Sequence, residues 1–346
     1  MNITQYLHAA PKAELHVHLE GSIQPSTLLL LAQRNCVSLP VSSITEMQDW
    51  FTYRDFDHFV EIYFAISGCL KTREDYELIA YEFGASMAQQ NIRYAEVTFS
   101  PSTHRYMLGI PYETYFGGLT QGRMRARADF GVEIRWIFDI VRNIEDSTHN
   151  RARADYTTAV AIEGKDDGVV ALGLGGAEVG YPPERFATWF DKARAAGLHS
   201  TPHAGETMGP ESVWGALRAL GAERLGHGVR SIEDAVLVSY LAERHIPLEV
   251  CPTSNLRLGV YPHITEHPLP SLYTAGVPVT VNSDDPSLFN TTLNHELELL
   301  AKPLNFELNT INEILLNGVR HSFLPLHEKQ ALEATFHDEM ARLNVV

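Results

Sequence analysis

The chain has 346 residues, 45% of them hydrophobic, so it can bury a sizeable core without the help of disulfides. Its 43 acidic residues outnumber the 27 basic ones and give a net charge of −16, which disfavours nucleic acid and anionic membranes as partners. The three cysteines are widely spaced, and the N-terminus lacks a basic flank followed by an apolar run, so we expect a soluble protein of the reducing cytoplasm.

Eight short apolar runs follow one another along the chain, and helical patterns separate most of them. Runs that are apolar throughout are typical of strands buried on both faces of a parallel sheet. Eight strand–helix units predict one (β/α)8 TIM barrel domain over residues 1–346, with a doubly wound sheet as the alternative architecture. The runs are Glu14–His18, Ile92–Thr98, Val132–Ile140, Val169–Gly173, Leu198–His203, Arg224–Gly228, Pro247–Cys251 and Val277–Asn282.

Two regions depart from this rhythm. Residues 40–90 are too long for one crossover helix and predict a helical insertion after the first strand. Phe56, Phe59 and Tyr63 recur there at helical spacing, so they either pack on the barrel or form an apolar wall over the substrate. We retain Phe56 and Phe59 as candidate substrate contacts. Residues 295–346 predict helices that close the domain.

Histidines mark the ends of three predicted strands, which is where a TIM barrel carries its catalytic side chains. His16 and His18 end the first run and point to the same side, because alternate residues of a strand share a face. His203 ends the fifth run, and Glu206 follows it as a candidate proton carrier. His227 ends the sixth run between two glycines, which leave its ring unshielded. Each histidine alone could equally be a packing residue.

Two adjacent carboxylates, Asp284 and Asp285, follow the eighth run. A solvated turn is one explanation, but two carboxylates at a buried strand end repel each other unless a cation lies between them. Three imidazoles and one carboxylate make a borderline donor set that suits zinc and leaves room for a water molecule, namely His16, His18, His203 and Asp284. Bound zinc would lower the pKa of that water to about 7. The sequence therefore predicts a metal-dependent hydrolase.

Several of these motifs together resemble the adenosine deaminase family of the amidohydrolase superfamily. The resemblance extends in order from about residue 11 to about residue 290. The segments that carry it are Ala13–Gly21, His203–Glu206, Leu225–Gly228, Val250–Asn255 and Asn282–Pro286. It implies hydrolytic removal of the 6-amino group of a purine, with one Zn²⁺ per subunit held by His16, His18, His203 and Asp284.

The resemblance also implies roles for further residues. Glu206 would protonate purine N1, and His227 would orient the attacking water and accept its proton. Asp285 would bind N7, and Gly176 would bind N3 through its backbone. Glu20, where many adenosine deaminases have aspartate, would face the sugar, and its longer side chain reaches further into the pocket or narrows it. The metal ligand His18 would border the substrate as well.

The substrate stays open between adenosine, aminodeoxyfutalosine and adenine. Adenine deaminases of the family typically differ at the positions of Thr207 and Gly226, which favours a purine nucleoside here. The segment Val132–Arg142 resembles bacterial members that deaminate aminodeoxyfutalosine in menaquinone synthesis, although ordinary strand ends would also explain it. Another amidohydrolase reaction or a non-catalytic binding protein is less favoured, since every catalytic motif is present. The oligomeric state does not follow from the sequence.

Other histidines, among them His104 and His267, follow no strand end, and we interpret them as surface or packing residues. Cys251 ends the seventh run and is expected to be a small buried residue.

Overall fold

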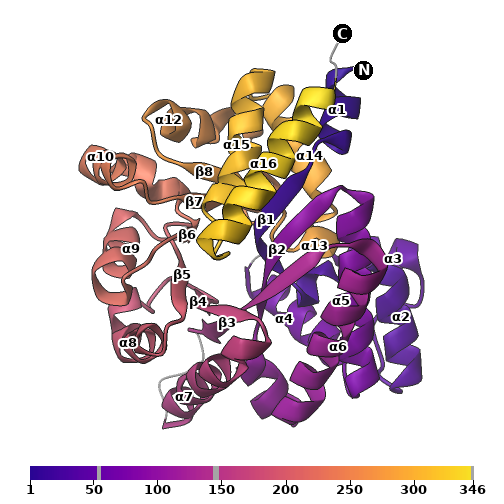
Figure 1. The fold of residues 1–346 in the computed structure, drawn as a ribbon. Helices are drawn as coiled ribbons and strands as arrows, with labels where there is room; N and C mark the ends of the chain where they lie inside the picture. Colours follow the sequence, from indigo (N-terminus) through magenta and orange to yellow (C-terminus); the bar gives the residue numbers. More distant parts are fainter. Residues whose placement is uncertain (53–55, 143–147, 344–346) are drawn as a thin grey trace.

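Eight parallel strands form a barrel in the order β1 to β8 (Figure 1). The computed structural model describes residues 1–52, 56–142 and 148–343, and the side chains of 56, 57 and 148–150 are likewise left undescribed. The two ends of the sheet meet where Val17 of β1 bridges Asp284, just after β8, and His18 N donates to Asp284 O at 2.8 Å. This closure confirms the predicted (β/α)8 barrel.

All eight predicted strands are present. They are β1 Lys12–His18, β2 Ile92–Phe99, β3 Glu133–Val141, β4 Val169–Gly175, β5 His199–Ala204, β6 Leu225–His227, β7 Leu248–Val250 and β8 Val279–Val281. The last three are shorter than predicted. Pro247 and Pro278 lack the N–H that a ladder needs, and Gly228 leaves the extended conformation with a φ of 66°. Hydrogen bonds between the strands still continue just past these bounds, since the carbonyls of Pro247 and Pro278 accept from the N–H groups of Leu225 and Leu248.

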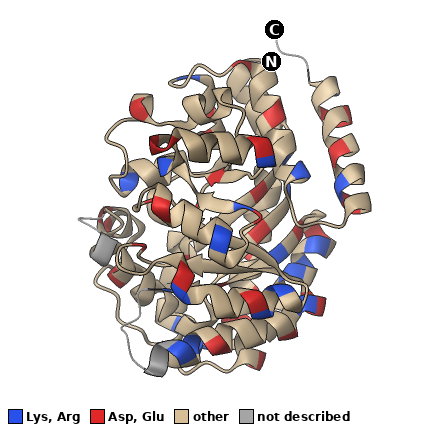
Figure 2. Cartoon of the chain, turned by 90° about the vertical axis from the view of Figure 1, so that its left-hand side faces the viewer, with Lys and Arg blue, Asp and Glu red and all other residues tan. Residues whose placement is uncertain are grey.

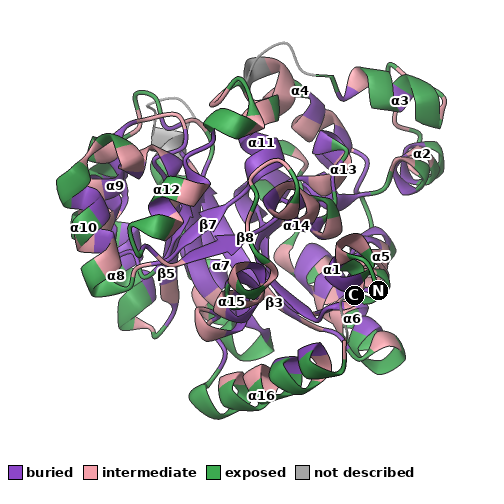
Figure 3. Ribbon diagram, turned by 90° about the horizontal axis from the view of Figure 1, so that it is seen from above, coloured by how far each residue is buried: buried purple, intermediate pink, exposed green. Residues whose placement is uncertain are grey.

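Helices surround the barrel, and Figure 3 shows the buried strands enclosed by helices whose outer faces are exposed. The N-terminal half contains α1 Ile3–Ala9, α2 Pro25–Arg34, α3 Ile44–Trp50, α4 Phe56–Ser67, α5 Arg73–Gln89, α6 Tyr112–Phe130 and α7 Thr148–Glu163. The C-terminal half contains α8 Ala187–Ala195, α9 Pro210–Gly215, α10 Ala235–Arg244, α11 Pro252–Arg257, α12 Leu269–Thr274, α13 Pro286–Phe289, α14 Leu293–Ala301, α15 Leu308–Arg320 and α16 Leu326–Arg342.

The predicted insertion at residues 40–90 contains α3, α4 and α5. Of these, α5 packs against β2 and α6, as a helix of the outer layer does. Two glycines of α6 allow the close approach: a Cβ at Gly118 would lie 2.3 Å from Arg73 O, and one at Gly122 would lie 2.4 Å from Glu77 O.

Acidic and basic positions are interspersed over the helices on the side of the molecule drawn in Figure 2. Within the described ranges, every helix is too short or too polar to cross a membrane.

Candidate active site

Four side chains that could hold a metal ion meet where β1, β5 and β8 end. One ligand atom from each of His16, His18, His203 and Asp284 lies within 4.8 Å of the others. The Oδ1 atom of Asp284 is 3.5 Å from His16 Nε2 and 3.4 Å from His18 Nε2. Asp284 has a φ of 63°, which is uncommon outside glycine, and its backbone is held by bonds to both histidines of β1. The structure thus brings the predicted ligand set together.

The orientation of these histidines fits a cation. The Nε2 atoms of His18 and His203 are only 3.4 Å apart, so two lone pairs would face each other without a proton or a metal between them. His16 bonds through Nδ1 to Glu249, which leaves its buried Nε2 without a hydrogen-bond partner among the described residues. Three nitrogens and one oxygen around a common point fit a divalent transition metal.

Glu249, on β7, supports the metal-ligand set through a hydrogen bond to His16. Its Oε2 lies 2.9 Å from His16 Nδ1, and its Oε1 accepts bonds from Thr201 and from Arg224 Nε at 2.6 Å. Although burial opposes it, the charge of Arg224 lowers the pKa of Glu249 to about 2. An ionised Glu249 fixes the proton of His16 on Nδ1 and keeps Nε2 free for a metal.

Gly226 makes room for two of the histidines. A Cβ at this position would lie 2.8 Å from His16 Cε1 and 3.2 Å from His203 Cα. We predicted that the glycines beside His227 leave its ring unshielded, and this is wrong because that residue is only 1% exposed. The glycine instead allows close packing of the neighbouring rings.

Glu206 lies beside His227, with its Oε1 3.6 Å from His227 Nε2. Burial and the nearby charges of Asp284 and Glu178 raise the pKa of Glu206 to about 8. Its Oε1 is buried and unpartnered among the described residues. A carboxyl group that is neutral at pH 7 and has no protein partner is suited to donate a proton to a ligand.

The carboxylate of Glu178 holds the loop that carries Glu206. It accepts bonds from four successive backbone amides, those of residues 205–208, at 2.6–3.0 Å. The hydroxyls of Thr207 and Ser212 donate to it as well. Burial opposes ionisation, but the charge of Arg142 and these bonds lower the pKa of Glu178. The sequence analysis missed this residue, because its role appears only once the loops after β4 and β5 are in contact.

Asp285 directly follows the metal ligand Asp284 and lies against the first βα turn. A Cβ at Gly21 would be 1.8 Å from its Oδ1, so the first βα turn has room for this carboxyl group only because Gly21 has no side chain. Burial and the charges of Asp284 and Glu20 raise the pKa of Asp285 well above its ordinary value. Its Oδ1 has no hydrogen-bond partner in the described part of the chain. The raised pKa favours the protonated form of Asp285, which can donate a hydrogen bond.

Glu20 is tied to the pocket wall by one of its two oxygens. Oε1 accepts from the backbone N–H of Ser100 at 3.2 Å and lies 3.0 Å from His104 Nε2. Our interpretation of His104 as a surface or packing residue is incomplete, since it is fully buried and its Nδ1 also meets the hydroxyl of Tyr76 at 2.7 Å. The other oxygen of Glu20 is buried and has no hydrogen-bond partner of regular geometry among the described residues, and the hydroxyl of Tyr63 lies near this carboxylate.

Helix α4 contributes aromatic residues near this wall. The rings of Phe59 and Phe289 stack with centroids 5.7 Å apart, which places α4 beside α13, the helix that follows Asp285. Burial, with the charges of Glu20 and Asp285, raises the pKa of Tyr63 well above its ordinary value. The side chain of Phe56 lies outside the described residues. A substrate contact by Phe59 stays a prediction.

Gly176 follows β4 with a φ of 81°, two residues before Glu178. Arg142, at the end of β3, donates from Nη2 to the carbonyls of Leu174 and His203, and its Nε and Nη1 are buried without partners among the described residues. Arg142 thus holds a carbonyl near the end of β5, just before the loop whose amides Glu178 holds. Nothing in its ordinary position at a strand end signalled this role.

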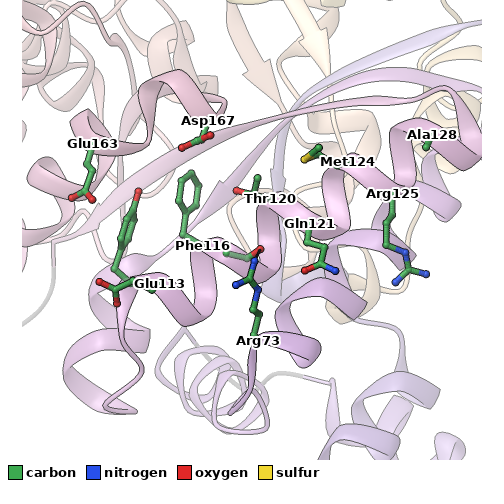
Figure 4. A pocket seen from close by; sticks show the side chains of 12 residues that line it. Arg73, Glu113, Phe116, Thr120, Gln121, Met124, Arg125, Ala128, Glu163 and Asp167 are labelled. Carbon is green, nitrogen blue, oxygen red and sulfur yellow. Dashed lines mark hydrogen bonds between the residues drawn. The ribbon is translucent and has the colours of Figure 1, made fainter.

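A surface groove of about 700 Å³ lies elsewhere, along the outer face of α6 (Figure 4). Phe116 and Met124 contribute apolar surface to it, and Arg73, Glu113 and Asp167 contribute charges. It contains none of the residues that converge at the strand ends.

Comparison with known proteins agrees with this arrangement of residues. The adenosine deaminase family model matches residues 11–339. The chain belongs to the adenosine deaminase family. It is 42% identical to an aminodeoxyfutalosine deaminase of Streptomyces coelicolor, over 92% of this chain and 81% of that protein.

Solved structures agree with this assignment. An adenine deaminase from Arthrobacter aurescens is 32% identical with a TM-score of 0.86, over 96% of this chain and 98% of that one. An amidohydrolase from Burkholderia ambifaria with bound zinc is 29% identical with a TM-score of 0.87, over 98% and 92%. This member of the family is therefore a metal-dependent hydrolase of C–N bonds in cyclic amidines, a deaminase of the amidohydrolase type.

Proposed function

We propose that this protein hydrolyses the 6-amino group of a purine nucleoside, with zinc as its metal and aminodeoxyfutalosine as the first candidate substrate. The proposed metal ligands are His16, His18, His203 and Asp284. The relative that is 42% identical favours aminodeoxyfutalosine over adenosine. The reaction would release ammonia and leave a 6-oxopurine.

The observation that carries the proposal is a set of hydrogen-bond donors that matches a purine ring. The ring nitrogens N1, N3 and N7 are all acceptors. The pKa of Glu206 is raised to about 8, so this group carries a proton at pH 7, and the raised pKa of Asp285 favours its protonated form. We assign Glu206 to N1, Asp285 to N7 and the backbone of Gly176 to N3. Ionised carboxylates in the same places would repel the ring nitrogens.

The proposed reaction uses these donors in turn. A zinc ion held by His16, His18, His203 and Asp284 would lower the pKa of a bound water to about 7 and so make it available for attack at neutral pH. As the water oxygen adds to C6, Glu206 gives its proton to N1, so negative charge does not build up on the ring. His227 would orient the attacking oxygen, since its Nε2 lies 3.6 Å from Glu206 Oε1 and 3.8 Å from Asp284 Oδ2. One proton of the water then passes to the amino group, which leaves as ammonia when the C6–N bond breaks, and the other restores the proton of Glu206.

Glu20 is the proposed contact for the sugar, because its buried Oε2 is free to accept a bond from a hydroxyl group.

Adenine is the second candidate substrate. The adenine deaminase that is 32% identical favours it.

The test is an absorbance assay of deamination on aminodeoxyfutalosine, adenosine and adenine in parallel, with zinc-loaded protein. A kcat/KM for aminodeoxyfutalosine at least about tenfold above the other two supports the proposal, since tenfold corresponds to about 1.4 kcal/mol of transition-state binding. A preference for adenine would establish the second candidate. Absence of turnover on all three by zinc-loaded protein would refute both.

A further inference from the structure

A chain of buried hydrogen bonds begins at a backbone amide and ends at His227. The N–H of Leu269 donates to His267 Nδ1 at 3.2 Å, and His267 Nε2 lies 3.1 Å from Asn255 Oδ1. Asn255 Nδ2 then lies 3.4 Å from His227 Nδ1. The three side-chain residues are at most 4% exposed. The chain thus joins the segment after β7 to the imidazole at the end of β6.

The positions of the protons follow from the first link. A backbone N–H can only donate, so His267 Nδ1 is an acceptor, and a neutral imidazole then carries its proton on Nε2. Burial lowers the pKa of His267 to about 4, so the ring is neutral at pH 7. Its Nε2–H donates to Asn255 Oδ1 and fixes which end of the amide faces His227. The amide NH₂ group therefore meets His227 Nδ1 as a donor.

We propose that Asn255 and His267 are positioning residues that hold His227 in the tautomer with its proton on Nε2. The hydrogen bond at one imidazole nitrogen decides the state of the other. His227 Nε2 lies 3.6 Å from Glu206 Oε1 and 3.8 Å from Asp284 Oδ2. An oxygen atom bound between these groups would receive a hydrogen bond from His227.

The tautomer of His227 is inferred without reference to a substrate, and only its consequence for the reaction rests on the proposed function. That consequence is a changed role for His227. The family resemblance implies that His227 accepts a proton from the water. In the tautomer inferred here, Nε2 already carries a proton, and Nδ1 accepts from Asn255. His227 therefore orients the attacking oxygen as a donor, and taking up a second proton would break the bond to Asn255.

Two substitutions of His267 distinguish a positioning role of these hydrogen bonds from a purely structural one. In His267→Gln, the amide oxygen can accept from Leu269 N–H and the amide nitrogen can donate to Asn255, so the direction of the chain is kept. His267→Leu has a similar volume but neither group, so the Asn255 amide is free to rotate. Asn255→Asp is a third variant, in which an acceptor faces His227 Nδ1 and favours a proton there.

The experiment is long-range ¹H–¹⁵N NMR of zinc-loaded protein with ¹⁵N-labelled histidine, combined with kcat and metal content. We expect a proton on His227 Nε2 in the wild type and in His267→Gln, with kcat within about threefold, and a kcat about 10–100-fold lower in His267→Leu at equal metal content. Asn255→Asp should move the proton to Nδ1 or add a second one.

A proton on His227 Nδ1 in the wild type would overturn the inference, whatever the variants do. Equal kcat in folded His267→Gln and His267→Leu would also overturn it. Because the NMR measurement needs no substrate, a protein that shows the Nε2–H state without deaminating any purine would refute the proposed function and leave this inference standing.

Discussion

Replacing Glu178 by glutamine tests whether one carboxylate holds Glu206 in place. Glu178 Oε2 accepts from the amides of residues 206–208, whereas Oε1 accepts from Gly205 N and Ser212 Oγ. The glutamine oxygen will face the three amides, because Ser212 can rotate to accept, and only Gly205 N–H then loses its acceptor. One unsatisfied buried N–H costs about 1–3 kcal/mol, and the lost charge weakens the remaining bonds, so we expect a loss of about 2–4 kcal/mol.

The assay is denaturant unfolding of zinc-loaded protein, with kcat and KM measured against pH. Loosening of the loop should lower kcat about tenfold or more with little change in KM. The charge of Glu178 helps to raise the pKa of Glu206, so its removal should lower that pKa. Because the protonated acid is the active form, the alkaline limb of kcat/KM should move to lower pH.

A matched control is Glu211→Gln, which removes an exposed carboxylate from the start of α9 that makes no hydrogen bond to these amides in the described structure. If Glu178→Gln unfolds, turns over and titrates as this control does, then Glu178 does not position Glu206.

Three further substitutions test other parts of the site. Glu206→Gln should keep its metal and lose at least about 100-fold in kcat, and full activity in this variant would exclude Glu206 from the reaction. In the wild type, kcat/KM should fall as pH rises through the raised pKa of Glu206, near 8. Glu249→Gln should weaken zinc binding about 10–100-fold in chelator competition, and unchanged affinity would contradict its support of His16. His104→Phe keeps an aromatic ring but removes the hydrogen bond that holds Glu20. The KM for a nucleoside should then rise about tenfold while the KM for adenine stays the same. Equal effects on both substrates would show that Glu20 does not contact the sugar.

The sequence predicted the parts of this protein that depend on local pattern. Eight apolar runs became eight strands, because a strand buried on both faces must be apolar along its length. His16, His18, His203 and Asp284 came together because parallel strands in a barrel place their C-terminal ends at one rim. Both predictions use a rule that holds within one strand and repeats around the barrel.

The supporting residues could not be predicted in this way. Glu178, Glu249 and His104 are ordinary residues in the sequence, and each acts through contacts with a different strand end. Their roles depend on hydrogen bonds between residues that lie 27–233 positions apart in the sequence. His267 illustrates the same limit: no local pattern distinguishes it, and only the fold places it beside Asn255.

The two adjacent residues Asp284 and Asp285 show how the fold separates the roles of like groups. Asp284 lies among His16, His18 and His227, and, although burial opposes ionisation, the bond to His16 and the proximity of these rings lower its pKa well below the ordinary value. Asp285 faces Asp284 and Glu20, so burial and like charges both raise its pKa. These surroundings favour the anion in Asp284, which suits a cation, and the protonated acid in Asp285, which suits a ring nitrogen. Glu178 and Glu206 divide in the same way, since the first faces amides and Arg142 while the second faces other carboxylates. Opposite protonation states in neighbouring carboxyl groups are what a site needs if it must bind a metal and donate protons to a purine at the same pH.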